Sequence, residues 1–166
     1  LYYYLRGEKE KYETAEVKVS TDKEGETYYE MLLKPREVAI SKNTDLAKVF
    51  DIKEIYFDLN KSDIRPDAAV ELAKIVEVMK EYPKMKIDIR SHTDSRASDA
   101  YNLALSDRRA KSTLEWIVKQ GIERKRLTAK GYGETRLVNG CSNGVPCTEE
   151  EHQANRRSEF IIVSME

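Results

Sequence analysis

The charged groups that could do chemistry are concentrated in residues 91–110, SHTDSRASDAYNLALSDRRA, where Asp94 precedes a helical pattern that contains Arg108 and Arg109. At about 100° per residue, Arg109 lies within about 40° of Leu105 on the apolar face of that helix, whereas Arg108 lies at about 300° on the solvated face. A carboxylate and a guanidinium are receptors for charged groups of opposite sign. The chemistry that this pair could do is therefore the recognition of charge.

The position of Arg109 requires a partner. A guanidinium on an apolar helix face costs several kcal/mol unless a carboxylate or a ligand meets it. In one interpretation, Asp94 at the end of the preceding strand forms an internal salt bridge with Arg109 and braces the strand–helix junction. In the other, the two charges hold opposite ends of one zwitterionic ligand. The residue pattern alone leaves both interpretations open.

Patterns for catalysis or metal binding are weak in this sequence. His92 and Asp94 have the spacing of a strand-borne metal pair, but no third ligand is close in sequence, so we predict no metal site. No serine or cysteine nucleophile stands out with a histidine and an acid, and no carboxylate pair suggests glycoside hydrolysis. GYGE at 131–134 lacks the length and the lysine of a phosphate loop. We therefore predict a protein without enzyme activity and without a cofactor.

The two cysteines, Cys141 and Cys147, flank SNGVP, a stretch that can close a tight loop. We expect a disulfide between them, which would imply an oxidising compartment. Two free thiols are the main alternative. A metal site is a further alternative, for which His152 is the only additional candidate nearby.

Composition restricts the class of protein. The chain has 166 residues, of which 36% are charged and 40% hydrophobic, and Lys+Arg at 29 against Asp+Glu at 30 give a net charge of −1. This balance argues against a nucleic-acid binder, which would carry a basic stripe. No apolar run reaches the roughly 18 residues that a membrane-spanning helix needs. Because the chain opens with Leu1, we expect it to be a piece of a larger protein.

The elements that must position Asp94 and Arg109 form an α+β pattern. We expect strands at 54–60, 85–94, 126–134 and 155–163, and amphipathic helices at 65–83 and 98–120. Pro66 suits a first helical turn, and Gly121 suits the end of the second helix. The order β-α-β-α-β-β predicts helices packed on a mixed sheet.

The first residues suggest a separate unit. AEVKVST and TYYEMLLK each alternate around the turn residues DKEGE, so residues 1–35 are predicted to contain a β-hairpin that ends an upstream β-sandwich. A lone hairpin is marginally stable in water, which favours additional strands upstream. We expect a linker at 36–44 and the second domain at 45–166.

Several separated motifs resemble one known family. IYFDLNKSDIRPDA, IRSHTDSRASDAYNLALSDRRAKS, LTAKGYGE and NRRSEF occur in the order found in OmpA-like peptidoglycan-binding domains, a family that includes peptidoglycan-associated lipoproteins and flagellar stator proteins. The similarity covers residues 50–163. It implies a β-α-β-α-β-β fold and a ligand, the meso-diaminopimelate side chain of the cell-wall stem peptide. KYETAEVKV also resembles the end of a carboxypeptidase-regulatory-like sandwich, a module of some large envelope lipoproteins.

The resemblance also implies roles for individual residues. Asp94 would receive the ammonium of the ligand, and Arg109 would receive its carboxylate through two parallel hydrogen bonds. Lysine in place of diaminopimelate lacks that carboxylate and would leave Arg109 unpaired. The remaining candidate residues are backbone groups near Asp63 and Ile64, the polar Asn102, the apolar walls Phe57 and Leu105, and Arg157, beside Arg156, as a contact to ligand or glycan.

The predicted function is non-covalent binding of peptidoglycan that tethers an outer-membrane or periplasmic protein of a Gram-negative bacterium to its wall. The outer membrane would be reached through parts of the protein outside this chain. The alternative keeps the fold but makes it a protein–protein interaction module of an envelope assembly or secretion complex.

Overall fold

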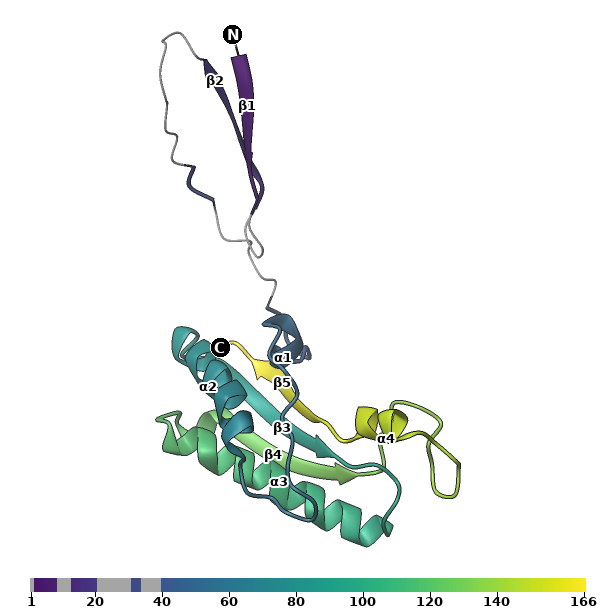
Figure 1. The fold of residues 1–166 in the computed structure, drawn as a ribbon. Coiled ribbons are helices and arrows are strands. Elements are labelled where there is room, and N and C mark those ends of the chain that lie inside the picture. The colour runs from purple at the N-terminus through teal and green to yellow at the C-terminus, as the bar shows by residue number, and fades with distance from the viewer. Residues whose placement is uncertain (1, 9–12, 21–30, 34–39) are drawn as a thin grey trace. The chain divides into compact units, whose positions relative to one another are not determined.

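The fold is shown in Figure 1, a computed structural model that describes residues 2–8, 13–20, 31–33 and 40–166. The chain divides into two compact units, residues 1–39 and residues 40–166. Among the described residues, no helix combines the length and the apolar character that a membrane crossing requires.

The N-terminal unit contains a pair of antiparallel strands, β1 (Tyr2–Gly7) and β2 (Ala15–Ser20), in a register that aligns Tyr2 with Ser20 and Gly7 with Ala15. The strand expected at 27–34 lies mostly outside the described residues, and its described part, residues 31–33, lies in no strand. In the described part of the chain, β2 pairs with the strand YYYLRG, whose tyrosines favour β structure. The rest of an upstream sandwich stays a prediction.

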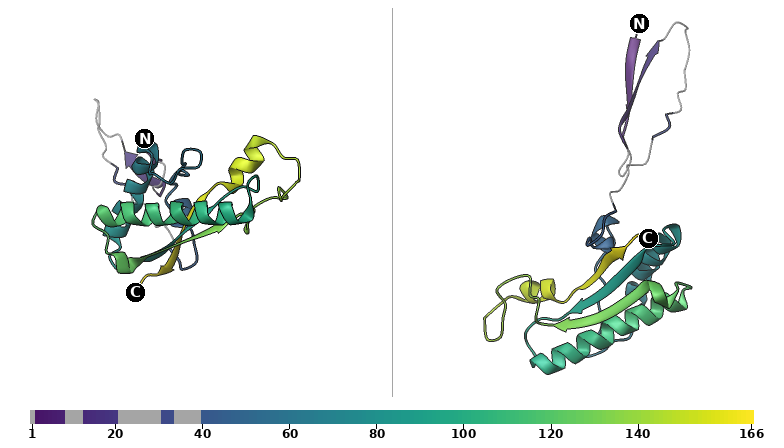
Figure 2. Two further views of the ribbon diagram at one scale, coloured as in Figure 1. Left: turned by 90° about the horizontal axis from the view of Figure 1, so that it is seen from below. Right: turned by 180° about the vertical axis from the view of Figure 1, so that it is seen from behind.

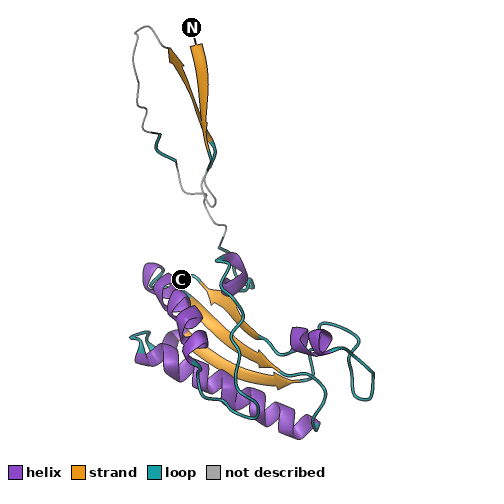
Figure 3. Cartoon of the chain, viewed as in Figure 1, coloured by secondary structure: helices purple, strands orange, loops and turns teal. Residues whose placement is uncertain are grey.

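The C-terminal unit is built on a mixed sheet with the strand order β4-β3-β5. β3 (Lys86–His92) pairs in parallel with β4 (Leu127–Gly133) and antiparallel with β5 (Ser158–Ser164). Figure 3 shows the helices α2 (Pro66–Glu81) and α3 (Asp99–Lys119) beside this sheet. The α+β class and both predicted helices are confirmed.

The hydrophobic core lies between the sheet and these two helices. Ile87 and Ile89 of β3 are completely buried, as are Leu72 and Ile75 of α2 and Ile117 of α3, and all belong to one cluster of buried side chains. The alternation along β3 and the helical spacing along α2 and α3 place these residues toward one another, as the sequence patterns predicted.

The strand expected at 54–60 is not formed. Residues 52–58 form no backbone ladder, and the edge of β5 is occupied by backbone groups of Asn43 and Thr44 and by the Glu54 side chain. The N–H of Asn43 donates to the carbonyl of Ile162, and the Glu54 carboxylate accepts the N–H of Ser158 at 2.6 Å. Residues 40–44, expected in the linker, therefore belong to the C-terminal unit.

Three short elements complete this unit: α1 (Leu46–Val49), the 3-10 turn η1 (Arg124–Arg126) and α4 (Glu149–Asn155). The views in Figures 1 and 2 agree that α4 lies beyond the ends of β3 and β4. Thr148 caps α4 in a capping box with Glu151, which fixes where this helix begins. The carboxyl end of β3, the start of α3 and α4 thus meet at one end of the sheet.

Candidate functional site

A cavity of about 580 Å³ lies at the end of the sheet where the chain leaves β3 and enters α3. Its walls come from the segment before α2, the loop after β3, the first turns of α3, α4 and the start of β5. Six of the residues proposed from the sequence line it: Phe57, Asp94, Asn102, Leu105, Arg109 and Arg157. Residues far apart in the sequence therefore converge on one cavity.

Arg109 is buried on α3, with 8% of its surface exposed, as the helical pattern predicted. Its Nε donates to the carbonyl of Lys61 at 2.9 Å, and its Nη2 donates to the carbonyl of Asp58 at 3.2 Å. The guanidinium carbon lies 5.0 Å from the centre of the Phe57 ring, a distance typical of a cation–π contact.

The charge of Arg109 lacks a carboxylate partner. Within the described part of the chain, no acidic side chain forms an ion pair with its guanidinium. Burial accordingly lowers the pKa of Arg109, because desolvation disfavours the charged form. A buried cation at the wall of a cavity is a receptor for an anion.

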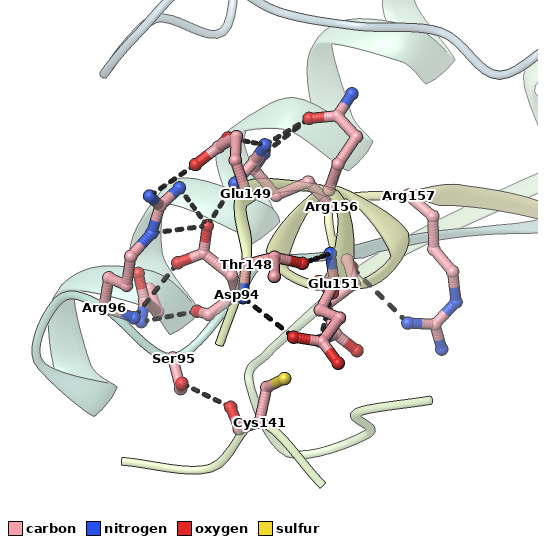
Figure 4. A network of polar contacts seen from close by, with 12 residues as sticks. Asp94, Ser95, Arg96, Cys141, Thr148, Glu149, Glu151, Arg156 and Arg157 are labelled. Atoms are coloured by element: carbon pink, nitrogen blue, oxygen red, sulfur yellow. Dashed lines mark hydrogen bonds and ion pairs between the residues drawn. The ribbon is translucent and has the colours of Figure 1, made fainter. Parts of the chain in front are cut away.

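Asp94 is engaged by two arginines rather than by Arg109. Its Oδ2 accepts from Nη2 of Arg96 at 2.8 Å and from Nη1 of Arg156 at 2.6 Å, and its Oδ1 accepts from the backbone N–H of Arg96 at 3.0 Å (Figure 4). Burial, the largest influence, raises the pKa of Asp94, but the hydrogen bonds from Arg96 and Arg156 together hold it at about 2. The internal salt bridge between Asp94 and Arg109 is therefore not formed.

The same two arginines also hold Glu149, the first residue of α4. Nη1 of Arg96 donates to Oε2 of Glu149 at 2.8 Å, and Nη2 of Arg156 donates to Oε1 at 2.5 Å. The two guanidinium groups thus bridge the two carboxylates of Asp94 and Glu149 (Figure 4). Neither Arg96 nor Glu149 was identified as a site residue from the sequence.

Asn102 organises the loop that carries Asp94. Its buried Nδ2 donates to the carbonyl of Asp94 at 3.1 Å and to Oε1 of Glu134 at 2.9 Å. It also lies 3.3 Å from the carbonyl of Ala97. The side-chain amide therefore fixes the backbone after β3, and with it the direction of the Asp94 carboxylate.

Asp63 and Ile64 are not among the residues that line the cavity, contrary to the prediction. Ile64 packs against the hydrophobic core instead. The same loop contributes Asn60 and Arg65 to the cavity wall. Asn60 has a left-handed backbone with φ of 58°. The loop therefore reaches the cavity wall at residues 60 and 65, on either side of the predicted Asp63 and Ile64.

The two arginines of the NRR motif differ in their contacts. Arg156 contacts Asp94, whereas Arg157, the predicted ligand contact, donates to the carbonyl of Arg136 at 3.0 Å and pairs with Glu159 at 3.0 Å. Glu159 also lies 2.7 Å from Nε2 of His92. The contact with His92 holds the pKa of Glu159 at about 2. The buried His92 therefore contacts the partly buried ion pair between Glu159 and Arg157.

Cys141 and Cys147 form the expected disulfide, with Cα atoms 6.0 Å apart. Ligand atoms of Cys141, Cys147 and Glu151 lie within 4.8 Å of one another. Because the two sulfur atoms are bonded to each other, they offer no thiolates to a metal. The carbonyl of Cys141 accepts the hydroxyl of Ser95 at 2.5 Å (Figure 4), so the disulfide loop is tied to the residue next to Asp94.

Comparison with known proteins shows what the segment that forms most of this cavity resembles. A model described as the OmpA family matches residues 56–151. A photosystem I P700 chlorophyll a apoprotein A2 of Gloeobacter violaceus is 42% identical over 113 residues, which are 66% of this chain and 13% of that protein. A peptidoglycan-associated lipoprotein of Brucella melitensis is 39% identical over 87 residues, which are 52% of each protein.

Among solved structures, the peptidoglycan-associated lipoprotein from Burkholderia pseudomallei aligns with a TM-score of 0.58 at 24% identity, covering 66% of this chain and 89% of that one. This similarity establishes a shared fold. The chain spans about half or less of the length of the two curated relatives described above.

Proposed function

The chain belongs to the OmpA family, and on that premise we propose that its cavity binds peptidoglycan non-covalently through the diaminopimelate of the stem peptide. The observation that carries this proposal is the buried Arg109 guanidinium, which lines the cavity without a carboxylate partner in the described part of the chain. Relatives named as peptidoglycan-associated lipoproteins support the same ligand class.

Arg109 is the receptor for the ligand carboxylate. A guanidinium has five N–H donors in a planar fork. The carbonyls of Lys61 and Asp58 take donors on Nε and Nη2, and these two bonds fix the plane of the group. The donors that remain can form charge-assisted bonds with a carboxylate, which would relieve the cost of the buried charge.

Asp94 is the receptor for the ligand ammonium. Its Oδ2 is engaged by Arg96 and Arg156, whereas its Oδ1 accepts the backbone N–H of Arg96. A carboxylate offers about four lone-pair sites, so Oδ1 can accept a further donor. An ammonium on Oδ1 and a carboxylate on Arg109 together recognise the free amino-acid end of diaminopimelate. Stem peptides with lysine lack that carboxylate and would bind more weakly.

These interactions describe a binding module rather than an enzyme. A single cavity that grips one amino-acid end predicts modest and reversible affinity. Such a module would tether an outer-membrane or periplasmic protein to the wall, in the envelope of a Gram-negative bacterium.

Substitution of Arg109 tests this function. We expect Arg109→Ala to weaken binding of a diaminopimelate-containing muropeptide by about 30-fold or more, because a charge-assisted forked contact is lost. Titration calorimetry measures the affinity, and sedimentation with purified sacculi measures wall binding. Arg108→Ala is the matched control, because Arg108 is the adjacent arginine of α3 and is exposed.

Arg109→Lys and Asp94→Asn guard against a folding artefact, since Arg109 also anchors the loop at 58–61. Lysine keeps the charge without the fork and should still lose most of the affinity. Equal sedimentation of wild type, Arg109→Lys and Asp94→Asn would instead favour a protein–protein interaction module.

A further inference from the structure

We propose that Arg96 and Arg156 form a second carboxylate subsite of the cavity, and that Glu149 occupies this subsite until a second carboxylate of the ligand replaces it. The inference rests on the proposed binding of the stem peptide. It adds a specificity determinant, because Glu149 would then decide how strongly the cavity prefers a ligand with two carboxylates over one with a single carboxylate.

The geometry of the arginine pair supports a subsite. Arg96 and Arg156 approach Asp94 from the loop after β3 and from the end of α4, and both extend past it to Glu149. Each guanidinium therefore spans two carboxylates (Figure 4). One of these, Asp94, is 8% exposed and fixed by the backbone of its loop, whereas Glu149 stands on the rim with 62% of its side chain exposed.

Glu149 is a weakly held occupant. Ion pairs between exposed side chains contribute little to stability, because water and salt screen them. Arg96 is half exposed, at 50% of its side chain, and Arg156 is 23% exposed, so both pairs are open to water on the Glu149 side. A ligand already anchored at Arg109 and Asp94 would bring a second carboxylate to the arginines without a further loss of translational freedom. Replacement of Glu149 by that carboxylate therefore requires little free energy.

Charge balance indicates what the subsite accepts. With Glu149 bound, Asp94 and Glu149 balance Arg96 and Arg156, and among the described residues of the cavity wall Arg109 remains without an ion-pair partner. The cavity then suits a single zwitterionic end. When Glu149 turns outward, Asp94 alone faces two arginines, and one more positive charge becomes available. The complete cavity then matches a ligand with one ammonium and two carboxylates.

The two subsites lie close enough to act on one ligand. Both arginine groups line the same cavity as Arg109. Burial has the largest effect on the pKa of Arg109. The charge of Arg156 lowers this pKa further, whereas the charge of Asp94 raises it, so both groups interact electrostatically with Arg109. Stem peptides carry carboxylates on the glutamate and on the main-chain end of diaminopimelate, besides the amino-acid end proposed for Arg109. Either of these could reach the rim.

Glu149→Gln tests the inference. We expect this variant to bind a muramyl tripeptide with all its carboxylates free about three- to tenfold more tightly than wild type does, because the competing charge is gone. Amidation of either the glutamate or the main-chain diaminopimelate carboxylate should remove that gain, which also identifies the group that enters the subsite. The affinities are measured by titration calorimetry at low ionic strength.

Glu150→Gln is the matched control. It removes the same charge from the same helical turn, its side chain is exposed, and it forms no ion pair within the described residues. This control should leave the affinity unchanged. If Glu149→Gln binds the tripeptide no better than Glu150→Gln while Arg109→Lys still loses most of the affinity, the second subsite is wrong and the proposed function stands. Absence of binding by wild type would overturn the proposed function itself.

Discussion

At the scale of single residues, two buried arginines differ in what their donors reach. Arg126 donates to the carbonyls of Met79 at 2.7 Å, Tyr82 at 2.8 Å and Met85 at 2.9 Å, so its guanidinium closes the end of α2. Arg109 reaches two carbonyls and lines a cavity. Burial of an arginine therefore does not by itself identify a binding group. A buried arginine that keeps unused donors at a cavity wall is identified as a binding group.

Glu54 gives a pH dependence to stability. Burial raises the pKa of Glu54 from 4.5 to about 7, against the opposing hydrogen bond from the N–H of Ser158. Between these two values the folded protein binds more protons than the unfolded chain, so stability should fall as pH rises from about 4.5 to 7. Glu54→Gln keeps an acceptor for Ser158 and removes the titration. We expect it to be more stable than wild type at pH 8 by roughly 1–3 kcal/mol, as measured by urea unfolding.

The comparison should be made at pH 5 and pH 8. At pH 5 the folded wild type keeps this carboxyl protonated, and the two proteins should differ little. Glu81→Gln, at the exposed end of α2, is the control and should follow wild type at both pH values. An equal gain at both pH values would rule out the titration of Glu54 as the cause.

The residues of the site were only partly predictable. The helical period separated Arg109 from Arg108, because a helix turns adjacent side chains by about 100°. The partners of Asp94 could not be found in this way, since Arg96 meets Glu149 across 53 residues and Arg156 meets Asp94 across 62. These pairs depend on how the disulfide loop returns α4 to the end of the sheet. The residues next to Asp94 in the sequence do not indicate this course of the chain.

At the scale of elements, periodicity predicted α2, α3 and the three strands of the sheet, because one face of each is buried in the core. The prediction failed at residues 54–60, which keep the alternation of a strand at Ile55, which is buried, and Phe57, which packs on the core. Alternation reports which side chains are buried, whereas a strand also requires a free edge to pair with. The edge of β5 is taken by Asn43 and Glu54.

The contact between β4 and α3 depends on Gly131. A Cβ at this position would lie 2.1 Å from the backbone nitrogen of Asp107 and 2.4 Å from Oγ of Ser106. Gly131→Ala should therefore push β4 away from the helix that carries Arg109, and we expect a loss of about 2–4 kcal/mol in the free energy of unfolding. Thermal and urea unfolding measure this loss.

Gly140→Ala provides the comparison, because a Cβ there would meet nothing within 4 Å. This variant should stay within about 0.5 kcal/mol of wild type. A similar loss in both variants would point to a general cost of alanine, and would contradict the close approach of β4 and α3.

At the scale of the whole molecule, the cavity joins a rigid wall to a loop-borne wall. Arg109 stands on α3, the helix whose inner face is packed in the core, whereas Glu149 and Arg156 border α4, which follows the disulfide loop. The two carboxylate subsites should therefore respond differently when the loop is loosened. Arg109 should keep its position, and the rim should lose order.

Removal of the disulfide tests this division. The bond closes a loop with a sequence separation of 6, and the chain-entropy model assigns about 2 kcal/mol to a loop of this size. We expect the double variant Cys141→Ser and Cys147→Ser to lose about that much stability, as measured by urea unfolding. Binding of a muropeptide through Arg109 should persist within about threefold of wild type, because the 58–61 loop and not the disulfide loop holds that guanidinium.

The advantage of Glu149→Gln should shrink in the same background, since the arginines that meet Glu149 would no longer be held beside it. Loss of all binding would instead mean that the contact from Ser95 to Cys141 keeps Asp94 in place, and that the loop shapes the primary site.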